Sequence, residues 1–262
     1  MTGNRQPAIG NRSFPLTTLA SLGVLFGCQV TPLTNKIRIG EEPFVIAVGE
    51  GADSLTDLWA ASAGGGGFIR LSFNRAEERA PRLAPDGRRL AFLRRIAGGA
   101  DSRWHLVLLD LLSNAEWTTP LPAGAGDPEA LGWSPDGARV VLRAGALYQS
   151  PAPPALVGLT AVSPEAVAAA DSLTRERLGP GNQGMLAPCD GTLCVQVGGA
   201  ITSLGDAVRG ALRWGPDSVG YFRGNVFEVR PLGGGRVRRP AWQSAPAGLR
   251  SLTHHPGVSS PR

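Results

Sequence analysis

The side chains of this sequence that are best suited to metal binding are three cysteines and three histidines. They are Cys28, Cys189, Cys194, His105, His254 and His255. A structural zinc site needs four ligands as a rule, and none of the histidines stands at a metal-ligand spacing from the second and third cysteines. We therefore predict no metal site and no cofactor, and we expect His254 and His255 to form an exposed pair.

Catalytic motifs are absent from the sequence. It contains no Gly-x-Ser-x-Gly elbow, no His-Glu-x-x-His and no Gly-x-x-x-x-Gly-Lys-Ser/Thr. The segment Gly179–Gly184 matches Gly-x-Gly-x-x-Gly, but it follows an expected helix rather than a strand, so we interpret it as a loop. These observations predict that the protein is not an enzyme.

The second and third cysteines occur in the segment Cys189-Asp-Gly-Thr-Leu-Cys194, around an Asp-Gly turn signal. A hairpin at this turn would bring the two residues within disulfide reach, which requires Cα atoms ~4.4–6.8 Å apart. An oxidising compartment would then favour the bond. We predict a Cys189–Cys194 disulfide, with two free thiols as the alternative.

The N-terminus has the pattern of a targeting segment. Residues 1–13 contain Arg5 and Arg12 and no acidic residue, and an apolar run follows from Phe14 to Phe26. This run is shorter than the ~20 residues of a membrane-spanning helix, and it has the length of the apolar part of a signal peptide. The pattern therefore predicts export.

The end of that run, Leu25-Phe26-Gly27-Cys28, resembles the lipobox of bacterial lipoproteins, although Phe26 departs from the usual small or aliphatic residue. The resemblance implies cleavage before Cys28 and a diacylglycerol on its thiol. Gln29, which is not Asp, implies the periplasmic face of the outer membrane by the sorting rule of enteric bacteria. The alternative is an ordinary signal peptide or an uncleaved anchor.

Three segments of the chain repeat one pattern, and a fourth, Met185–Val195, repeats it weakly. The three segments share a turn flanked by apolar residues and contain Pro85-Asp86-Gly87, Pro135-Asp136-Gly137 and Pro216-Asp217-Ser218. Pro presets φ at the first corner of a turn, Asp bonds the backbone that follows it, and Gly accepts a positive φ. Each unit therefore predicts a strand, a tight turn and a second strand.

These units resemble the PD40 (WD40-like) repeat of TolB-like propellers, and their spacing is near the ~40–50 residues of a blade. The resemblance implies an all-β fold, a β-propeller of about five or six four-stranded blades over residues 43–256. It also implies that the ring closes by pairing Phe44–Val48 with Leu249–Thr253. The other divisions we predict are a signal peptide (1–27), a linker after the lipid (28–42) and a C-terminal tail (257–262).

Residues 151–183 lack a blade pattern. Ser163-Pro164-Glu165 has the features of a helix start, and Gly179-Pro180 those of a stop. We predict a short inserted helix over Pro164–Leu178 that lies against the rim, with a partner-docking element as the alternative.

The net charge of +5 is not concentrated in one place. Lys36 is the single lysine, and the densest basic cluster is the short Arg236–Arg239, so we predict no nucleic-acid partner. The expected function is that of a monomeric, lipid-anchored scaffold that binds another envelope protein. The alternatives are a small molecule or glycan bound in the propeller channel and, less favoured, a hydrolase-related propeller.

Overall fold

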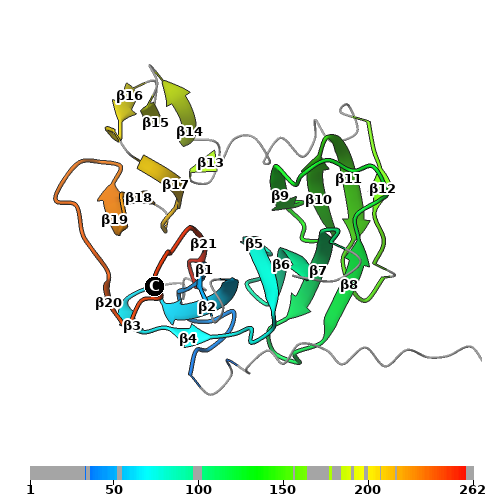
Figure 1. The fold of residues 1–262 in the computed structure, drawn as a ribbon. Helices are drawn as coiled ribbons and strands as arrows, with labels where there is room; N and C mark the ends of the chain where they lie inside the picture. The colour runs from blue at the N-terminus through cyan, green and yellow to red at the C-terminus, as the bar shows by residue number, and fades with distance from the viewer. Residues whose placement is uncertain are drawn as a thin grey trace, which may run out of the picture.

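The structure is a computed structural model and describes most of the chain after residue 35. The described residues are 33, 36–51, 55–96, 102–155, 157–163, 177–178, 184–189, 192–197, 200–206, 208–215 and 217–257. In this part of the chain, five antiparallel sheets are arranged as the blades of a ring (Figure 1). The predicted all-β propeller fold is confirmed.

The blades follow the order of the chain, except at the point where the ring closes. The first blade has the strand order β21 (Ser251–His255), β1 (Phe44–Glu50), β2 (Thr56–Ser62) and β4 (Ile69–Arg70). The second has β5 (Ala76–Leu83), β6 (Arg89–Ile96), β7 (His105–Asp110) and β8 (Glu116–Pro120). The third has β9 (Ala130–Trp133), β10 (Arg139–Ala144), β11 (Ala146–Pro151) and β12 (Thr160–Ala161).

Two more blades complete the described ring. The fourth contains β13 (Arg177–Leu178), β14 (Gly184–Cys189), β15 (Thr192–Val197) and β16 (Ala200–Ser203). The fifth contains three strands, β17 (Val208–Arg213), β18 (Ser218–Arg223) and β19 (Val226–Pro231), and a single bridge from Val229 to Arg238 takes the place of a fourth. Outside the blades, β3 (Gly65–Gly67) pairs in parallel with β20 (Ala241–Gln243).

The Pro-Asp-Gly turns join the first two strands of the second and third blades. The Asp86 carboxylate accepts the backbone N–H of Arg88 at 2.9 Å, and Asp136 accepts that of Ala138 at the same distance. Gly87 and Gly137 both have φ of 67°, which a residue with a side chain adopts at a cost. The local chemistry of the repeat therefore accounts for the hairpins.

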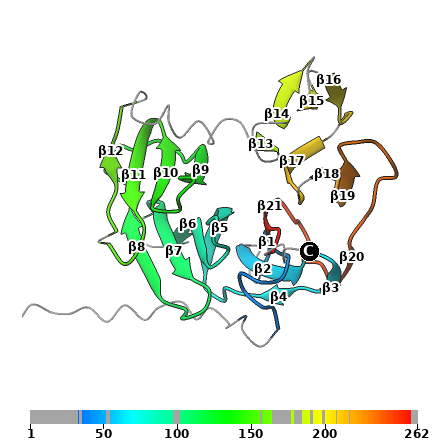
Figure 2. The ribbon, with the colours of Figure 1, turned by 180° about the vertical axis from the view of Figure 1, so that it is seen from behind.

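The two ends of the described chain close the ring. β21 pairs with β1, and the register joins Phe44 to His255 and Val48 to Ser251. The predicted closure is confirmed, but the closing strand is Ser251–His255 rather than Leu249–Thr253. Both views show β21 beside β1, with β5 of the next blade close by (Figure 1, and from behind in Figure 2). The first blade thus takes its innermost strand from the C-terminal part of the chain.

Closure buries His255 and half-buries His254, a pair that the sequence predicted to be exposed. His255 is 7% exposed and packs on the Phe44 ring, with 5.7 Å between centroids. The His254 ring stacks on Trp214 of the fifth blade at 4.2 Å and 13°. The expectation was wrong because the partners of both rings are distant in sequence and meet them only when the ring closes.

The predicted helix over Pro164–Leu178 falls largely on residues 164–176, which are outside the described residues. Its last two residues, Arg177 and Leu178, form β13 and pair with β14. The helix therefore does not extend to Leu178.

Part of the predicted linker packs into the core. Leu33, Ile37 and Ile39 are at most 8% exposed and belong to the apolar cluster between the first and second blades. This cluster also contains Leu90 and Leu109 of the second blade. The chain is therefore already anchored to the propeller at Leu33, ten residues before the expected boundary at 43.

Substitutions in the two matched turns measure how tightly the closing strand packs. A Cβ on Gly87 would lie 2.4 Å from Cδ2 of His255, whereas one on Gly137 would meet the flexible end of Arg89 at 3.0 Å. Gly137→Ala is expected to lower the free energy of unfolding by about 1 kcal/mol, the cost of alanine at positive φ. Gly87→Ala is expected to lose about 1–3 kcal/mol more because of overpacking. Urea unfolding of both variants checks this. Equal losses of unfolding free energy would show that the His255 ring is not packed against Gly87.

Candidate binding pocket

Strand directions give the propeller two faces. The turns at 84–88 and 134–138, the β7–β8 turn at 111–115 and the segment 36–43 lie on one face, which we call the turn face. Direct contacts support this placement, because Leu111 donates its N–H to Arg88 O, and a Cβ on Gly40 would lie 3.6 Å from Asp86 O. The connection 121–129 lies on the opposite face, which we call the pocket face.

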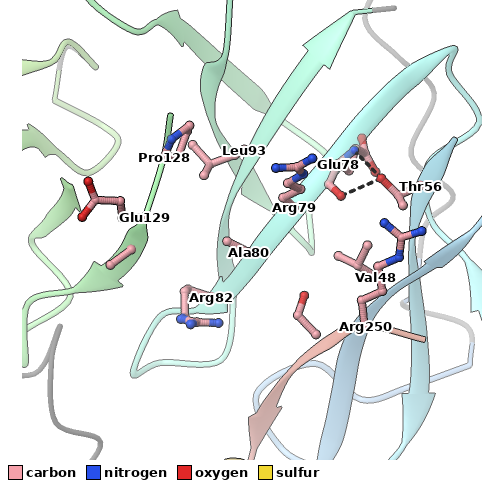
Figure 3. Close-up of a pocket in the computed structure, with 12 residues that line it drawn as sticks. Val48, Thr56, Glu78, Arg79, Ala80, Arg82, Leu93, Pro128, Glu129 and Arg250 are labelled. Carbon is pink, nitrogen blue, oxygen red and sulfur yellow. Dashed lines mark hydrogen bonds between the residues drawn. The ribbon is translucent and has the colours of Figure 1, made fainter. Parts of the chain in front are cut away.

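A pocket of about 380 Å³ opens where the inner strands of three blades meet (Figure 3). The first blade contributes to it from β1, β2 and β21, the second from β5 and β6, and the third from β9 and the residues before it. Its lining consists of Val48, Thr56, Glu78, Arg79, Ala80, Arg82, Leu93, Pro128, Glu129, Ala130, Arg250 and Ser251. The pocket therefore depends on how the blades are arranged, and no single repeat contains it.

A β-bulge shapes the wall that β5 forms. The register between β5 and β6 shifts between Arg79 and Arg82, and Ala80 has φ of 50°. A bulge bends a strand and redirects its side chains. β17 has the same kind of shift between Arg209 and Leu212, where Gly210 has φ of 59°. The bulge is thus found in the inner strands of two blades, and in β5 it falls between Arg79 and Arg82, which line the pocket together with Ala80.

Arginines supply most of the charge around the pocket. Arg82 is held in place because its Nε donates to Leu131 O at 3.0 Å. Arg79 forms an ion pair with Glu77, and its guanidinium lies 4.9 Å from the centre of the Trp104 ring. Arg250 and Glu129 lie on opposite sides of the pocket (Figure 3). Apolar walls with positioned charges of both signs suit the binding of a polypeptide segment or a small polar molecule.

A buried polar network lies behind the pocket, between the first and second blades. Its centre is Glu78, whose side chain is 0% exposed. Glu78 Oε1 accepts a hydrogen bond from Arg94 Nε at 3.1 Å and lies 3.0 Å from Nη2 of the same guanidinium in an ion pair. Glu78 Oε2 accepts the backbone N–H of Leu58 at 3.1 Å and the Ser72 hydroxyl. The same arginine reaches Glu116 at 2.7 Å. These bonds join β2, β5, β6 and β8, so the network ties two blades together.

The second buried carboxylate of this network is Asp57, which pairs with Arg70 and accepts the Ser72 hydroxyl at 3.4 Å. Burial raises the pKa of Asp57 and also that of Glu78, and the neighbouring arginines oppose this shift. Raised carboxyl pKa values occur at catalytic sites. Here, however, the carboxylate oxygens of Glu78 are directed at protein donors, which favours a structural role.

The predicted site residues that the structure describes do not line this pocket. Asp86, Asp136 and Asp217 occupy turns on the turn face, whereas Pro216 and Cys28 lie outside the described residues. Among the described residues, no group of three or more His, Cys, Asp or Glu side chains is arranged to hold a metal ion. The described part of the chain also holds no helix with the length and apolarity that crossing a bilayer requires.

The predicted disulfide falls in the hairpin of β14 and β15. The register places Cys189 opposite Thr192 and Cys194 opposite Ala187. Cys194 is 3% exposed and is disulfide-bonded. The side chain of Cys189 is outside the described side chains, so its identity as the partner stays a prediction.

Comparison with known proteins finds similar chains among solved structures only. No protein-family model matches the chain, and no curated protein matches it. Among solved structures, the chain is similar to TolB from Acinetobacter baumannii, with a TM-score of 0.41 and 15% identity over 76% of this chain and 52% of that one. It thus spans about half the length of TolB.

Solved structures from other classes of protein are also similar to this chain. The β-propeller domain of the Trilobed protease from Pyrococcus furiosus has a TM-score of 0.41 and 11% identity over 77% of this chain and 82% of that one. A puromycin hydrolase has a TM-score of 0.34 and 15% identity over 77% and 36%. The function therefore has to be argued from the site.

Proposed function

We propose that this chain is a lipid-anchored, non-enzymatic β-propeller of the bacterial cell envelope that binds another protein through the pocket face. The observation that carries the proposal is the pocket itself. Inner strands of three blades form it, and its lining joins apolar walls to arginine side chains from two blades. Rigid strands hold these groups in place, which lowers the entropy cost of binding.

The titratable groups of the pocket support a role without catalysis. No histidine or cysteine lines the described pocket. The Thr56 hydroxyl, a conceivable nucleophile, donates to Glu78 O at 2.8 Å and accepts the backbone N–H of the same residue. Glu78 is held by Arg94. A nucleophile needs an adjacent base. Here Thr56 and Glu78 instead form the hydrogen bonds and the ion pair that connect the two blades.

Site-specific photocrosslinking in cells tests the protein-binding role. We expect p-benzoylphenylalanine at Ala130, which lines the pocket, to capture one envelope protein. The same group at Ala138, exposed on the turn face of the same blade, is the matched control and should not capture it. Arg250→Ala should weaken the crosslink from position 130. Capture of the same protein from both positions, or from neither, would count against the proposal.

A second candidate is a small molecule or glycan in the same pocket, because about 380 Å³ is within the range of ligand sites, ~300–1,000 Å³. Native mass spectrometry of the purified protein separates the two. A non-protein adduct that Arg250→Ala removes, with no protein crosslink from Ala130, would favour this candidate.

The proposed anchor has its own test. Intact mass of the protein isolated from membranes should correspond to a chain that starts at Cys28 and carries acyl groups. An unmodified Cys28 would refute the anchor. The same spectrum, compared before and after reduction, checks the predicted Cys189–Cys194 bridge through a difference of two protons.

A further inference from the structure

We infer that the turn face lies against the membrane and that the pocket face points away from it. The inference rests on the proposed lipid at Cys28 and adds an orientation to it. Its basis is where the N-terminal part of the chain first joins the propeller, which fixes the face nearest the lipid.

The first step concerns the length of the tether. Leu33 is 1% exposed and is packed in the core cluster between the first and second blades. It stands five positions after Cys28, and five extended residues span at most ~17 Å. A lipid on Cys28 would therefore keep this part of the propeller within about 17 Å of the membrane surface.

The second step concerns which face this is. Leu33 O accepts the N–H groups of Lys36 and Ile37, and the chain then passes Gly40, beside the Asp86 turn, before β1 begins. At the same end of the strands, a Cβ on Gly257 would lie 2.8 Å from Glu41 O. The tether thus meets the propeller on the turn face.

The third step concerns the distance between the faces. β5 runs from the pocket face to the turn face over eight residues, or ~26 Å at ~3.3 Å per residue. Glu129 and Ala130 of the pocket lie at the far end of such strands. The same short tether that holds the turn face to the membrane therefore directs the pocket toward the periplasm, where a partner can reach it.

The exposed charges of segment 36–43 on the turn face are balanced, so they attract an anionic lipid surface only weakly. Exposed Lys36 and Arg38 are matched by exposed Glu41 and Glu42, and Arg38 pairs with Glu42 at 3.5 Å. Tether length would thus set the orientation, and high salt, which screens surface charges, should leave it unchanged.

Paramagnetic broadening measures the orientation directly. The protein that starts at Cys28 is coupled through this thiol to a maleimide phospholipid, the site of coupling is verified by mass, and the product is placed in nanodiscs with a gadolinium-chelating lipid. We expect the amide signals of Lys36 and Leu112 on the turn face to broaden at least about ten-fold more than those of Gly124 and Glu129, because relaxation falls with the sixth power of distance and the faces are about 26 Å apart.

A longer tether provides the matched control. An insertion of about 20 Gly and Ser residues after Gln29 has a root-mean-square length of about 25 Å, and it should reduce the difference between the faces severalfold. Equal broadening on both faces with the native tether, or stronger broadening at Gly124 and Glu129, would overturn the inference. Because the lipid is attached chemically, an orientation that fails here is distinguishable from a Cys28 that is not acylated in cells.

Discussion

Glu78→Ala is expected to lower the free energy of unfolding by about 3–5 kcal/mol, the usual cost of removing one partner of a buried ion pair. Arg94 is 4% exposed and would keep Glu116 as its remaining carboxylate partner. The N–H of Leu58 would lose one of its two acceptors, and the Ser72 hydroxyl would lose its closest one. The loss should therefore include the cost of the buried Arg94 charge, which no longer has its ion pair with Glu78, and weaker hydrogen bonding of these donors.

The preceding residue provides a matched control. Glu77 lies on the opposite side of β5 and pairs with Arg79 and Arg95, whose side chains are 51% and 39% exposed. Ion pairs with exposed partners contribute ~0–1 kcal/mol, so Glu77→Ala should cost about 1 kcal/mol or less. Urea unfolding of the two variants at neutral pH makes the comparison, and similar midpoints would mean that Glu78 does not hold the blades together.

The conservative variant Glu78→Gln separates charge from hydrogen bonding. The amide keeps the volume and one acceptor oxygen but removes the negative charge opposite Arg94. Because burial raises the pKa of Glu78, the neutral form is already less unfavourable at this site than in water. We therefore expect Glu78→Gln to lose less stability than Glu78→Ala, measured in the same unfolding experiment.

The sequence could predict what is local in this fold. A Pro-Asp-Gly turn is determined by three adjacent residues, and the apolar alternation on either side determines the hairpin. Ring closure could also be predicted, because an unpaired strand at each end of a propeller would leave exposed edges. β21 and β1 form this pair.

The buried network could not be predicted, because a bulge sets its register. Continuing the pairing of Leu83 with Leu90 without interruption would place Glu78 opposite Arg95. The shift between Arg79 and Arg82 moves the register by one residue, so that Glu78 instead faces Arg94. A slip of one residue exchanges the two faces of a strand. The Glu-Glu and Arg-Arg pairs were visible in the sequence, but which members would be buried was not.

The candidate pocket could not be predicted from the sequence for a different reason. Its lining comes from strands of three blades that are separated in sequence by up to about 200 residues, from Val48 to Ser251. Repeat patterns describe each blade but not which inner side chains meet at the centre. The burial of His254 and His255 was missed for the same reason, since Trp214 and Phe44 are distant along the chain.

That burial leads to the second large effect, a loss of stability in mild acid. Burial lowers the pKa of His254 to about 4 from the ordinary 6.5, and it also lowers the pKa of His255. The unfolded chain therefore binds protons at a higher pH than the folded one does. The stabilisation is fully present above pH 6.5 and is lost as the pH falls toward 4, and for His254 it amounts to at most about 3 kcal/mol.

A variant that cannot be protonated isolates this contribution from the carboxylates that titrate in the same range. His254→Phe keeps a flat ring to stack on Trp214, whose centroid lies 4.2 Å from that of His254. Its free energy of unfolding, measured by urea denaturation from pH 7.5 to 4.5, should fall less steeply than that of the native protein, so the difference between the two should grow as the pH falls. His105→Gln removes an imidazole from β7, which takes no part in the closing strand, and serves as the control. Parallel curves for His254→Phe and the native protein would show that the ring closes without excluding a charged imidazole.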